Sequence, residues 1–166
     1  VSLPSITWEW AVANQVGLVR EVGDLWPDCE EQMTKSMAFG VRMGIGRFDI
    51  EVAGRVEAAR TEANRRIADL FDSVDVVICA SNPDVAFPAE IESNTRVAGE
   101  KAPAGNNGAL TIPANISGNP AVSVPAGLVD GRPVGVQLIG RQHTDRMVLD
   151  LAAAWERLAP WPLVAP

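Results

Sequence analysis

Histidine and cysteine are scarce in this sequence, and their scarcity excludes several kinds of site. The 166 residues contain one histidine, His143, and two cysteines, Cys29 and Cys79. A serine–histidine–aspartate triad needs a histidine base, but His143 precedes a predicted helix, where a histidine usually serves as a solvated or capping residue. The scattered carboxylates show no metal-ligand spacing, and two cysteines form no disulfide framework. We therefore expect no metal site and a reducing, cytoplasmic location.

Clustered basic charge, long apolar runs and phosphate-binding loops are also missing. The formal net charge is −7, and a negative surface disfavours nucleic acid and anionic lipid, which attract clusters of lysine and arginine. No run approaches the roughly 18–20 apolar residues that span a bilayer, and no charged-then-apolar leader opens the chain. No GxGxxG or Walker-type loop occurs. The sequence predicts no nucleic-acid partner, no membrane partner and no cofactor.

The residues that are present suit a folded α/β protein. Apolar residues make up 47% of the sequence and charged residues 21%, which is enough for a buried core. Apolar side chains recur every three or four positions over residues 7–22 and 49–70, which predicts two helices. Another helix is predicted over residues 28–44, because Asp28 can cap its first turn and Glu31 stands at the capping-box position.

Strand signals begin after the third predicted helix. Residues 74–80 form a short β-branched run with little alternation, which is typical of a strand covered on both faces in a parallel sheet. Two later apolar runs, 121–126 and 134–139, are separated by the turn signal Asp130-Gly131 and predict a hairpin. Strand after helix indicates α/β architecture, and we expect these strands to belong to a larger mixed sheet flanked by helices.

The remaining segments are a loop and a last helix. Residues 81–109 show no sustained period and predict a long irregular segment, which is usually functional or mobile. The last helix should be capped at Thr144. Its predicted buried stripe consists of Met147, Val148, Leu151, Ala152, Trp155 and Leu158. We interpret the chain as a single fragment with a helical part over 1–73 and a strand, loop, hairpin and helix over 74–166.

Prolines and glycines recur over residues 111–127. Prolines fix backbone angles, and Gly118 and Gly127 permit conformations closed to other residues, so this segment should be a rigid entry into a buried strand. Asn115 can hydrogen-bond a loop backbone through its side-chain amide, which favours a structural role over substrate contact.

Residues 111–127 (TIPANISGNPAVSVPAG) and 130–141 (DGRPVGVQLIGR) resemble the C-terminal signature of amidase-signature enzymes. The resemblance implies amide-bond hydrolysis through an acyl-enzyme. In that family a serine nucleophile, a second serine joined by a cis peptide and a lysine base perform catalysis. This sequence has no Gly-Gly-Ser-Ser-like stretch, and its lysines, Lys35 and Lys101, do not match the family lysine. We therefore carry over no catalytic residue, and expect the C-terminal portion of an amidase that lacks this segment.

The same resemblance suggests a pocket wall and a structural motif. The stretch before the signature approaches the active site in the family, which makes four residues substrate-pocket candidates: Asn106, Asn107, Gly108 and Thr111. The structural motif comprises Asn115, Gly118, Pro120, Gly135 and Gln137. In the tRNA-dependent amidotransferases of this family, an aspartate that helps to hold the amino-acid substrate occupies the place of Gly108. Its absence here favours a general amidase.

Two alternatives stay open, namely a non-catalytic interaction or scaffold domain derived from an amidase, and the tRNA-dependent amidotransferase A subunit. The first residues carry no initiator methionine and suggest a start in mid-fold. We therefore expect three partners: a small-molecule amide substrate in the full-length protein, a missing N-terminal segment of the same fold, and further copies joined through open sheet edges.

Overall fold

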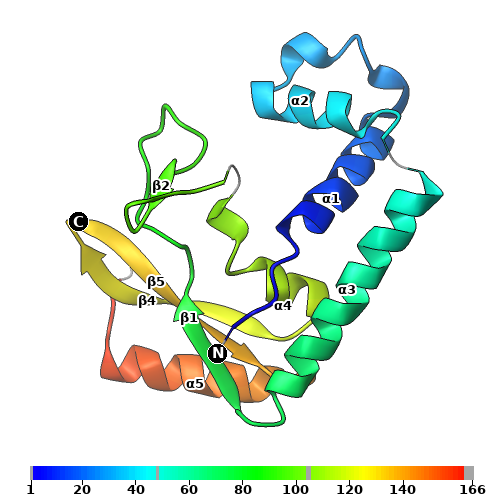
Figure 1. The fold of residues 1–166 in the computed structure, drawn as a ribbon. Coiled ribbons are helices and arrows are strands. Elements are labelled where there is room, and N and C mark those ends of the chain that lie inside the picture. The colour runs from blue at the N-terminus through cyan, green and yellow to red at the C-terminus, as the bar shows by residue number, and fades with distance from the viewer. Residues whose placement is uncertain (1, 48, 104–105, 163–166) are drawn as a thin grey trace. The chain divides into compact units, whose positions relative to one another are not determined.

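The computed structural model describes residues 2–47, 49–103 and 106–162, which form two compact units (Figure 1). One unit comprises residues 6–62, and the other comprises residues 1–5 together with 63–166. Each unit is described by itself below. The long helix α3 (Ile50–Leu70) contributes residues to both.

Helices make up the unit of residues 6–62. Helix α1 (Thr7–Val22) is followed by the short 3-10 turns Gly23–Leu25 and Glu30–Gln32, then by α2 (Lys35–Gly44) and the first part of α3. Helix α1 packs directly on α2. Gly44 lies at this contact, where an added Cβ would come within 2.9 Å of the Gln15 carbonyl oxygen. The Arg55 guanidinium also stacks on the Trp8 ring, 4.2 Å from its centroid.

The predicted helices over residues 7–22 and 49–70 are confirmed by α1 and α3. Asp49 caps α3, because its Oδ1 accepts a hydrogen bond from the Val52 amide at 2.8 Å. The helix predicted to start at Asp28 is wrong. Thr34 caps α2 instead and accepts the Met37 amide at 3.4 Å. The turn that begins at Thr34 leads into Ala38 and Val41, the buried residues that dock α2, so packing selects the later start.

An antiparallel sheet organises the other unit. Its strands are β1 (Val76–Ala80), β4 (Ala121–Val129) and β5 (Arg132–Gly140), in the order β1-β5-β4. The loop after β1 contains the two-residue strands β2 (Arg96–Val97) and β3 (Glu100–Lys101), then a 3-10 turn at Asn106–Gly108. Helix α4 (Ile112–Ser117) precedes β4, and α5 (Asp145–Leu158) follows β5. The predicted α/β class and the β4–β5 hairpin are confirmed, with Asp130-Gly131 as its turn.

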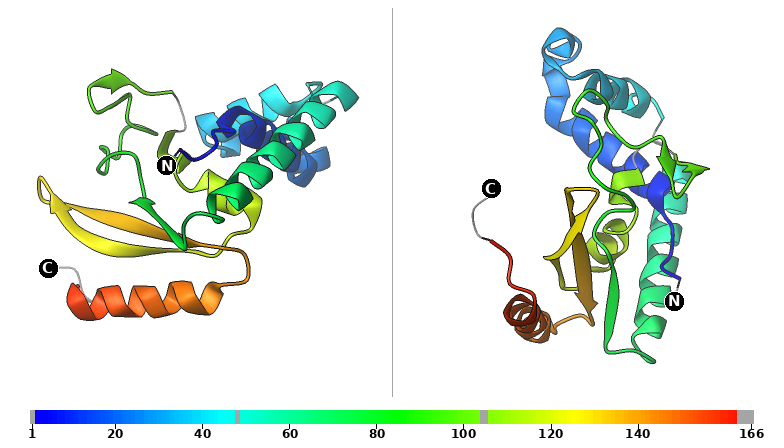
Figure 2. Two further views of the ribbon diagram at one scale, coloured as in Figure 1. Left: turned by 60° about the horizontal axis from the view of Figure 1, so that its bottom comes forward. Right: turned by 90° about the vertical axis from the view of Figure 1, so that its left-hand side faces the viewer.

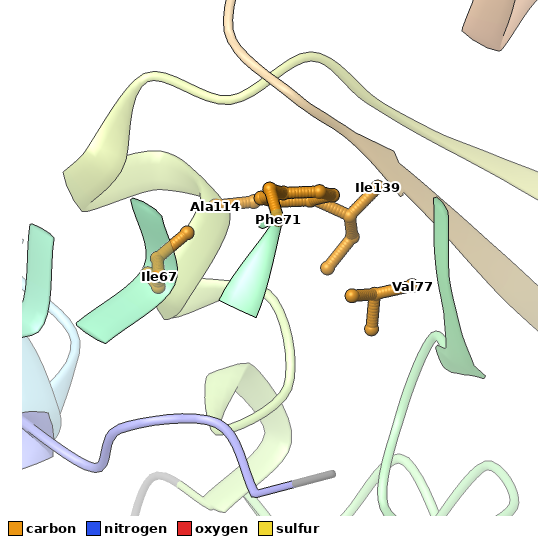
Figure 3. Close-up of a cluster of buried hydrophobic side chains, with 5 residues drawn as sticks. All are labelled: Ile67, Phe71, Val77, Ala114 and Ile139. Carbon is orange, nitrogen blue, oxygen red and sulfur yellow. The ribbon is translucent and has the colours of Figure 1, made fainter. Parts of the chain in front are cut away.

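The sheet has a helical layer on each face (Figure 2). Helix α5 runs along one face and contacts β4 and β5. The end of α3 and helix α4 pack against one end of the other face. Between them and the sheet lies a core of five buried side chains, from Ile67, Phe71, Val77, Ala114 and Ile139 (Figure 3). This core holds the loop after β1 and the segment before β4 on the same side of the sheet.

Three expectations are wrong: the parallel pairing of β1, the burial of β1 on both faces, and part of the buried stripe of α5. Strand β1 pairs antiparallel with β5 and is not covered on both faces, because Ile78 is 63% exposed. Within the predicted stripe of α5, Leu151 and Leu158 are exposed. Helix α5 packs on β4 and β5 only. Part of its predicted stripe, including the last turn, therefore lies beyond the apolar surface of the sheet.

The segment before β4 also differs from the prediction. Residues 111–127 contain a short helix, α4, in addition to the expected strand entry, because Pro113 suits the first helical turn and Gly118 ends the helix in a left-handed conformation at φ 68°. At the start of α5, Thr144 occupies the predicted capping position. Its hydroxyl donates backwards to the Arg141 carbonyl oxygen at 2.6 Å and makes no cap hydrogen bond.

The two outer strands of the sheet differ in how open their edges are. Ser81 N–H donates to Gly135, so by the antiparallel alternation the backbone groups of Val76, Ile78 and Ala80 point away from β5. On β4 the corresponding outward position includes Pro125, which has no N–H, and its carbonyl oxygen accepts the Trp155 indole at 2.9 Å. A register shift follows directly after Pro125. Within this three-stranded sheet, β1 therefore has an open edge, whereas the edge of β4 is blocked at Pro125.

Candidate functional site

A cavity of about 550 Å³ lies where the loop after β1 meets the turn end of the β4–β5 hairpin. Its polar lining residues are Asn82, Asp84, Asn94, Asn106 and Asn107. Its apolar lining includes Val85, Phe87, Val129, Pro133, Val134 and Val136. A concave, partly apolar site with a few polar groups is the usual form of a small-molecule pocket.

Strand β5 fixes the start of this loop. The Ser81 amide donates to the Gly135 carbonyl oxygen at 2.9 Å, which continues the β1–β5 ladder by one residue. The Ser81 and Ser123 hydroxyls hydrogen-bond to each other across Gly135. A Cβ on Gly135 would lie 2.8 Å from the Ser81 oxygen and 3.0 Å from the Ser123 oxygen, so only glycine leaves room for this pair. Gly135 thereby sets the path of the chain into the cavity wall.

Two asparagines brace the far part of the loop. The Asn94 side-chain nitrogen donates to the Val85 carbonyl oxygen at 3.0 Å. The Asn107 nitrogen donates to the Glu92 carbonyl oxygen at 3.3 Å. Each bond gives a backbone carbonyl oxygen the partner that it would have in a helix or a strand. These bonds stabilise the conformation of the irregular loop.

Asn106 is the most buried polar residue of the cavity wall, with 6% of its surface exposed. Its Oδ1 is shielded from solvent and accepts no hydrogen bond among the described residues. A buried acceptor without a donor costs about 1–3 kcal/mol, so such groups are few in a folded protein, and Asn64 Oδ1 on α3 is another one here.

The structure brings together two of the four residues predicted for the pocket. Asn106 and Asn107 line the cavity, whereas Gly108 and Thr111 do not. Thr111 precedes α4, and its hydroxyl donates to the Gly108 carbonyl oxygen at 3.1 Å. These two residues shape the backbone between the cavity and α4.

Sequence reasoning missed Asn82, Asp84 and Asn94 as lining residues. They lie in the segment without a period, far along the chain from Asn106. One signal was present, because Asn82 and Asp84 follow immediately after a predicted strand. Loops that leave the end of a strand frequently carry binding residues.

The structural-motif residues lie around α4 and the sheet. Asn115 is exposed on α4, and its side chain makes no hydrogen bond among the described residues, which departs from the expected backbone contact. The neighbouring Asn119 makes that kind of contact, because its side-chain nitrogen donates to the Gly140 carbonyl oxygen at 2.7 Å. The Pro120 carbonyl oxygen accepts the Gly140 amide at 2.9 Å. Asn119 and Pro120 therefore join the end of α4 to β5.

Gln137 links the sheet to the segment before α4. Its buried side-chain nitrogen donates to the Leu110 carbonyl oxygen at 3.0 Å and contacts the Cys79 sulfur at 3.4 Å. Replacing Gln137 by leucine leaves the Leu110 carbonyl without this donor, and we expect a loss of about 1–2 kcal/mol in the free energy of unfolding, measured by urea denaturation. The matched exposed change Gln32→Leu should stay within about 0.5 kcal/mol. Equal effects of the two changes would contradict this role of Gln137.

A second cavity, of about 580 Å³, lies between the end of α3 and the loops around residues 117–119 and 141–143. Its arginines face carboxylates. Arg65 pairs with Asp69 at 2.6 Å, and Arg141 pairs with Asp72 at 3.4 Å. His143 also lines this cavity and is exposed at the surface. This arrangement suits a structural surface depression.

The described lining of the first cavity lacks the usual bases and thiol nucleophiles. The first cavity has no histidine, lysine or cysteine among its described lining residues. In the described part of the chain, no group of three or more His, Cys, Asp and Glu side chains could hold a metal ion. Lys35 and Lys101 are both exposed and line neither cavity. No helix within the described ranges has the length and apolarity needed to cross a membrane.

Comparison with known families decides which group this fold belongs to. The Amidase family profile matches residues 30–149, which is most of the chain. The chain belongs to the amidase family. The A subunit of glutamyl-tRNA(Gln) amidotransferase from Lacticaseibacillus casei is 42% identical over 118 residues, which cover 71% of this chain and 23% of that protein. Its counterpart from Chloroflexus aurantiacus is 29% identical over 160 residues, or 90% of this chain and 31% of that one.

Solved amidase structures share the fold. A bacterial aryl acylamidase of the amidase-signature enzymes aligns with a TM-score of 0.76 at 25% identity, over 93% of this chain and 34% of its own. Another amidase aligns with a TM-score of 0.84 at 20% identity, over 95% of this chain and 37% of its own. The glutamyl-tRNA(Gln) amidotransferase A subunit from Thermotoga maritima aligns with a TM-score of 0.52 at 25% identity, over 97% of this chain and 34% of its own. The chain thus spans about a third of these amidase-family relatives, or less.

Proposed function

We propose that this chain is the C-terminal portion of an amidase that hydrolyses carboxylic amide C–N bonds through an acyl-enzyme. The family match over residues 30–149 carries the proposal. The likeness to the aryl acylamidase, with a TM-score of 0.76 at 25% identity, supports a general amide hydrolase.

In this proposal the chain contributes scaffold and one wall of the substrate pocket. The cavity beside Asn106 and Asn107 holds polar and apolar groups that can orient an amide, but no nucleophile with a neighbouring base. An acyl intermediate needs both. The Ser-cisSer-Lys group of the family would therefore come from a segment outside these 166 residues, and this chain alone would be inactive.

Hydrolysis of a simple aryl amide by the protein encoded by the complete reading frame tests this function. We expect turnover, and replacement of the serine in a Gly- and Ser-rich stretch by alanine should lower kcat at least about a thousandfold, as nucleophile removal does in other serine hydrolases. The 166-residue chain should show no turnover in the same assay. Turnover by that chain alone, or turnover unaffected by the serine change, contradicts the proposal. No turnover by the complete protein favours the non-catalytic scaffold.

A second candidate is the tRNA-dependent amidotransferase A subunit, which the 42% identity to the Lacticaseibacillus casei protein favours. Gly108 disfavours the amidotransferase subunit, because glycine offers no carboxylate to hold a substrate ammonium group. Amide transfer to glutamyl-tRNA(Gln), dependent on co-purified partner subunits, would support this candidate. Hydrolysis of aryl amides without any partner would support the general amidase.

The proposed partner of this chain is the missing N-terminal segment of the same fold, which can pair with the sheet. Strand β1 has an open edge with apolar residues, and Ile78 is exposed beside it. A strand from the rest of the protein can pair there and cover Ile78. Cys29 and Cys79 are free thiols, which supports the proposed reducing, cytoplasmic location.

A further inference from the structure

The walls of the cavity beside Asn106 differ in how firmly they are held. One wall belongs to β5, where the half-buried Val136 lines the cavity. Val136 pairs with Ala80 of β1 on one side and with Val124 of β4 on the other. A strand in the middle of a sheet has hydrogen-bonded neighbours along both edges, so this wall is rigid.

Another wall is the irregular segment of residues 82–87, whose burial alternates. Val85 and Phe87 are half-buried, whereas Asp84 and Ala86 are exposed, and all four line the cavity. The half-buried positions are the ones with the larger apolar side chains, which gain most from leaving water. Val85 and Phe87 therefore form the apolar surface of this wall.

Side-chain amides hold this irregular segment in place. Within the described part of the chain, two hydrogen bonds join residues 82–93 to residues outside that range. The Asn94 side-chain nitrogen donates to the Val85 carbonyl oxygen at 3.0 Å, and the Asn107 nitrogen donates to the Glu92 carbonyl oxygen at 3.3 Å. The bond of Asn94 is the shorter one, and it ends on a residue of the apolar wall itself. Asn94 thus fixes the backbone at Val85.

We infer that Asn94 is a positioning residue that determines specificity, because it holds Val85 and Phe87 ready to contact an apolar group of a neutral amide substrate. The inference rests on the proposed amidase function and names the substrate class of the same site. A wall that is already ordered loses little conformational entropy when a ligand binds, so fixing it raises the affinity. Without the Asn94 bond, part of the binding energy would be used to order residues 82–87.

Two neutral amides with different apolar groups, benzamide and propionamide, test this role in the complete protein. Asn94→Asp keeps the size of the side chain and replaces its N–H donor by an oxygen that repels the Val85 carbonyl oxygen. We expect the KM for benzamide to rise about tenfold, and at least about five times more than the KM for propionamide, because the smaller group buries less of the apolar wall. Steady-state hydrolysis gives both constants.

Two further variants separate positioning from a general loss of structure. Asn94→Gln retains an amide donor and should keep the KM for benzamide within about threefold of the unchanged protein. Asn119→Asp removes a donor of the same kind, from the bond to the Gly140 carbonyl oxygen at 2.7 Å, but Asn119 lies outside the lining of this cavity. It should therefore leave the ratio of the two KM values unchanged.

A double substitution tests whether Asn94 acts through the apolar wall. Phe87→Ala alone should raise the KM for benzamide about tenfold, because truncation removes the contact with the ring. In that background Asn94→Asp should add less than about threefold, since both changes affect the same wall. Equal changes of the two KM values after Asn94→Asp, or its full tenfold effect in the Phe87→Ala background, would overturn the inference.

The inference and the proposed function fail in different ways. Calorimetry measures benzamide binding separately, on the complete protein with its serine nucleophile replaced by alanine so that no ligand is consumed. Binding that weakens about tenfold with Asn94→Asp, without hydrolysis by the unchanged protein, would overturn the amidase function and support the role of Asn94. Hydrolysis without the expected KM ratio would support the amidase function and overturn the role of Asn94. Absence of both binding and hydrolysis would overturn both.

Discussion

Replacing Phe71 by alanine should lower the free energy of unfolding by about 3–5 kcal/mol. Phe71 is 4% exposed and lies in the core with Ile67, Val77 and Ile139, where the end of α3 meets the sheet (Figure 3). Truncation removes the transfer energy of the ring and leaves a cavity that this two-layer contact cannot close. Urea denaturation followed by circular dichroism measures the loss.

Phe39 provides the matched control for this change, because it is 58% exposed on α2. Phe39→Ala should change the free energy of unfolding by less than about 1 kcal/mol, as is typical of exposed positions. If Phe71→Ala and Phe39→Ala cost the same, the assignment of the core to the α3–sheet contact is incorrect.

Gly140→Ala should destabilise the protein by about 2–3 kcal/mol, in the upper part of the range for overpacking. A Cβ at this position would lie 2.5 Å from Val148 Cγ2 and 2.6 Å from the Thr144 hydroxyl oxygen. Val148 is a buried residue of α5, so it cannot move aside without separating α5 from the sheet. Thermal and urea unfolding curves give the size of the effect.

Gly54→Ala should have the opposite sign. Gly54 lies inside α3, and an added Cβ there meets nothing within 4 Å. Alanine should therefore stabilise the helix by about 0.5–1 kcal/mol through its higher helix propensity. Destabilisation by Gly54→Ala, or no effect of Gly140→Ala, would contradict the packing described for the respective helix.

Elements with a strong local pattern were predictable from the sequence. Helices α1 and α3 have apolar residues at three- and four-residue spacing, and Asp49 supplies a cap before α3. The hairpin has a turn signal at Asp130-Gly131 between two apolar runs. In these cases local propensity and tertiary packing favour the same structure, so the pattern alone suffices.

Elements that depend on distant contacts were not predictable. Asp28 and Thr34 are both good capping residues, and the docking of Ala38 and Val41 selects the second. Leu158 continues the apolar pattern of α5 but is 87% exposed. The spacing of apolar residues predicts which face of a helix is apolar, but not how much of that face the rest of the protein covers. The short helix α4 has only six residues, too few for any periodic signal.

The candidate site was half predictable for a related reason. Asn106 and Asn107 were found through the family resemblance of the segment that follows them, which fixes their place relative to the sheet. Asn94 is held at the same cavity by the bond from its side chain to the Val85 carbonyl oxygen, and such contacts leave no periodic trace in a sequence.

Pro125 limits how this sheet can grow. Strand β4 offers no amide at that position, and its carbonyl oxygen is held by Trp155, which makes β1 the more open edge of the three-stranded sheet. Two copies that join β1 to β1 use up the β1 edge of each, so pairing through this strand would stop at a two-fold pair. Because the rest of the fold would compete for the same strand, a dimer of this kind reports that the remaining segment is not in place.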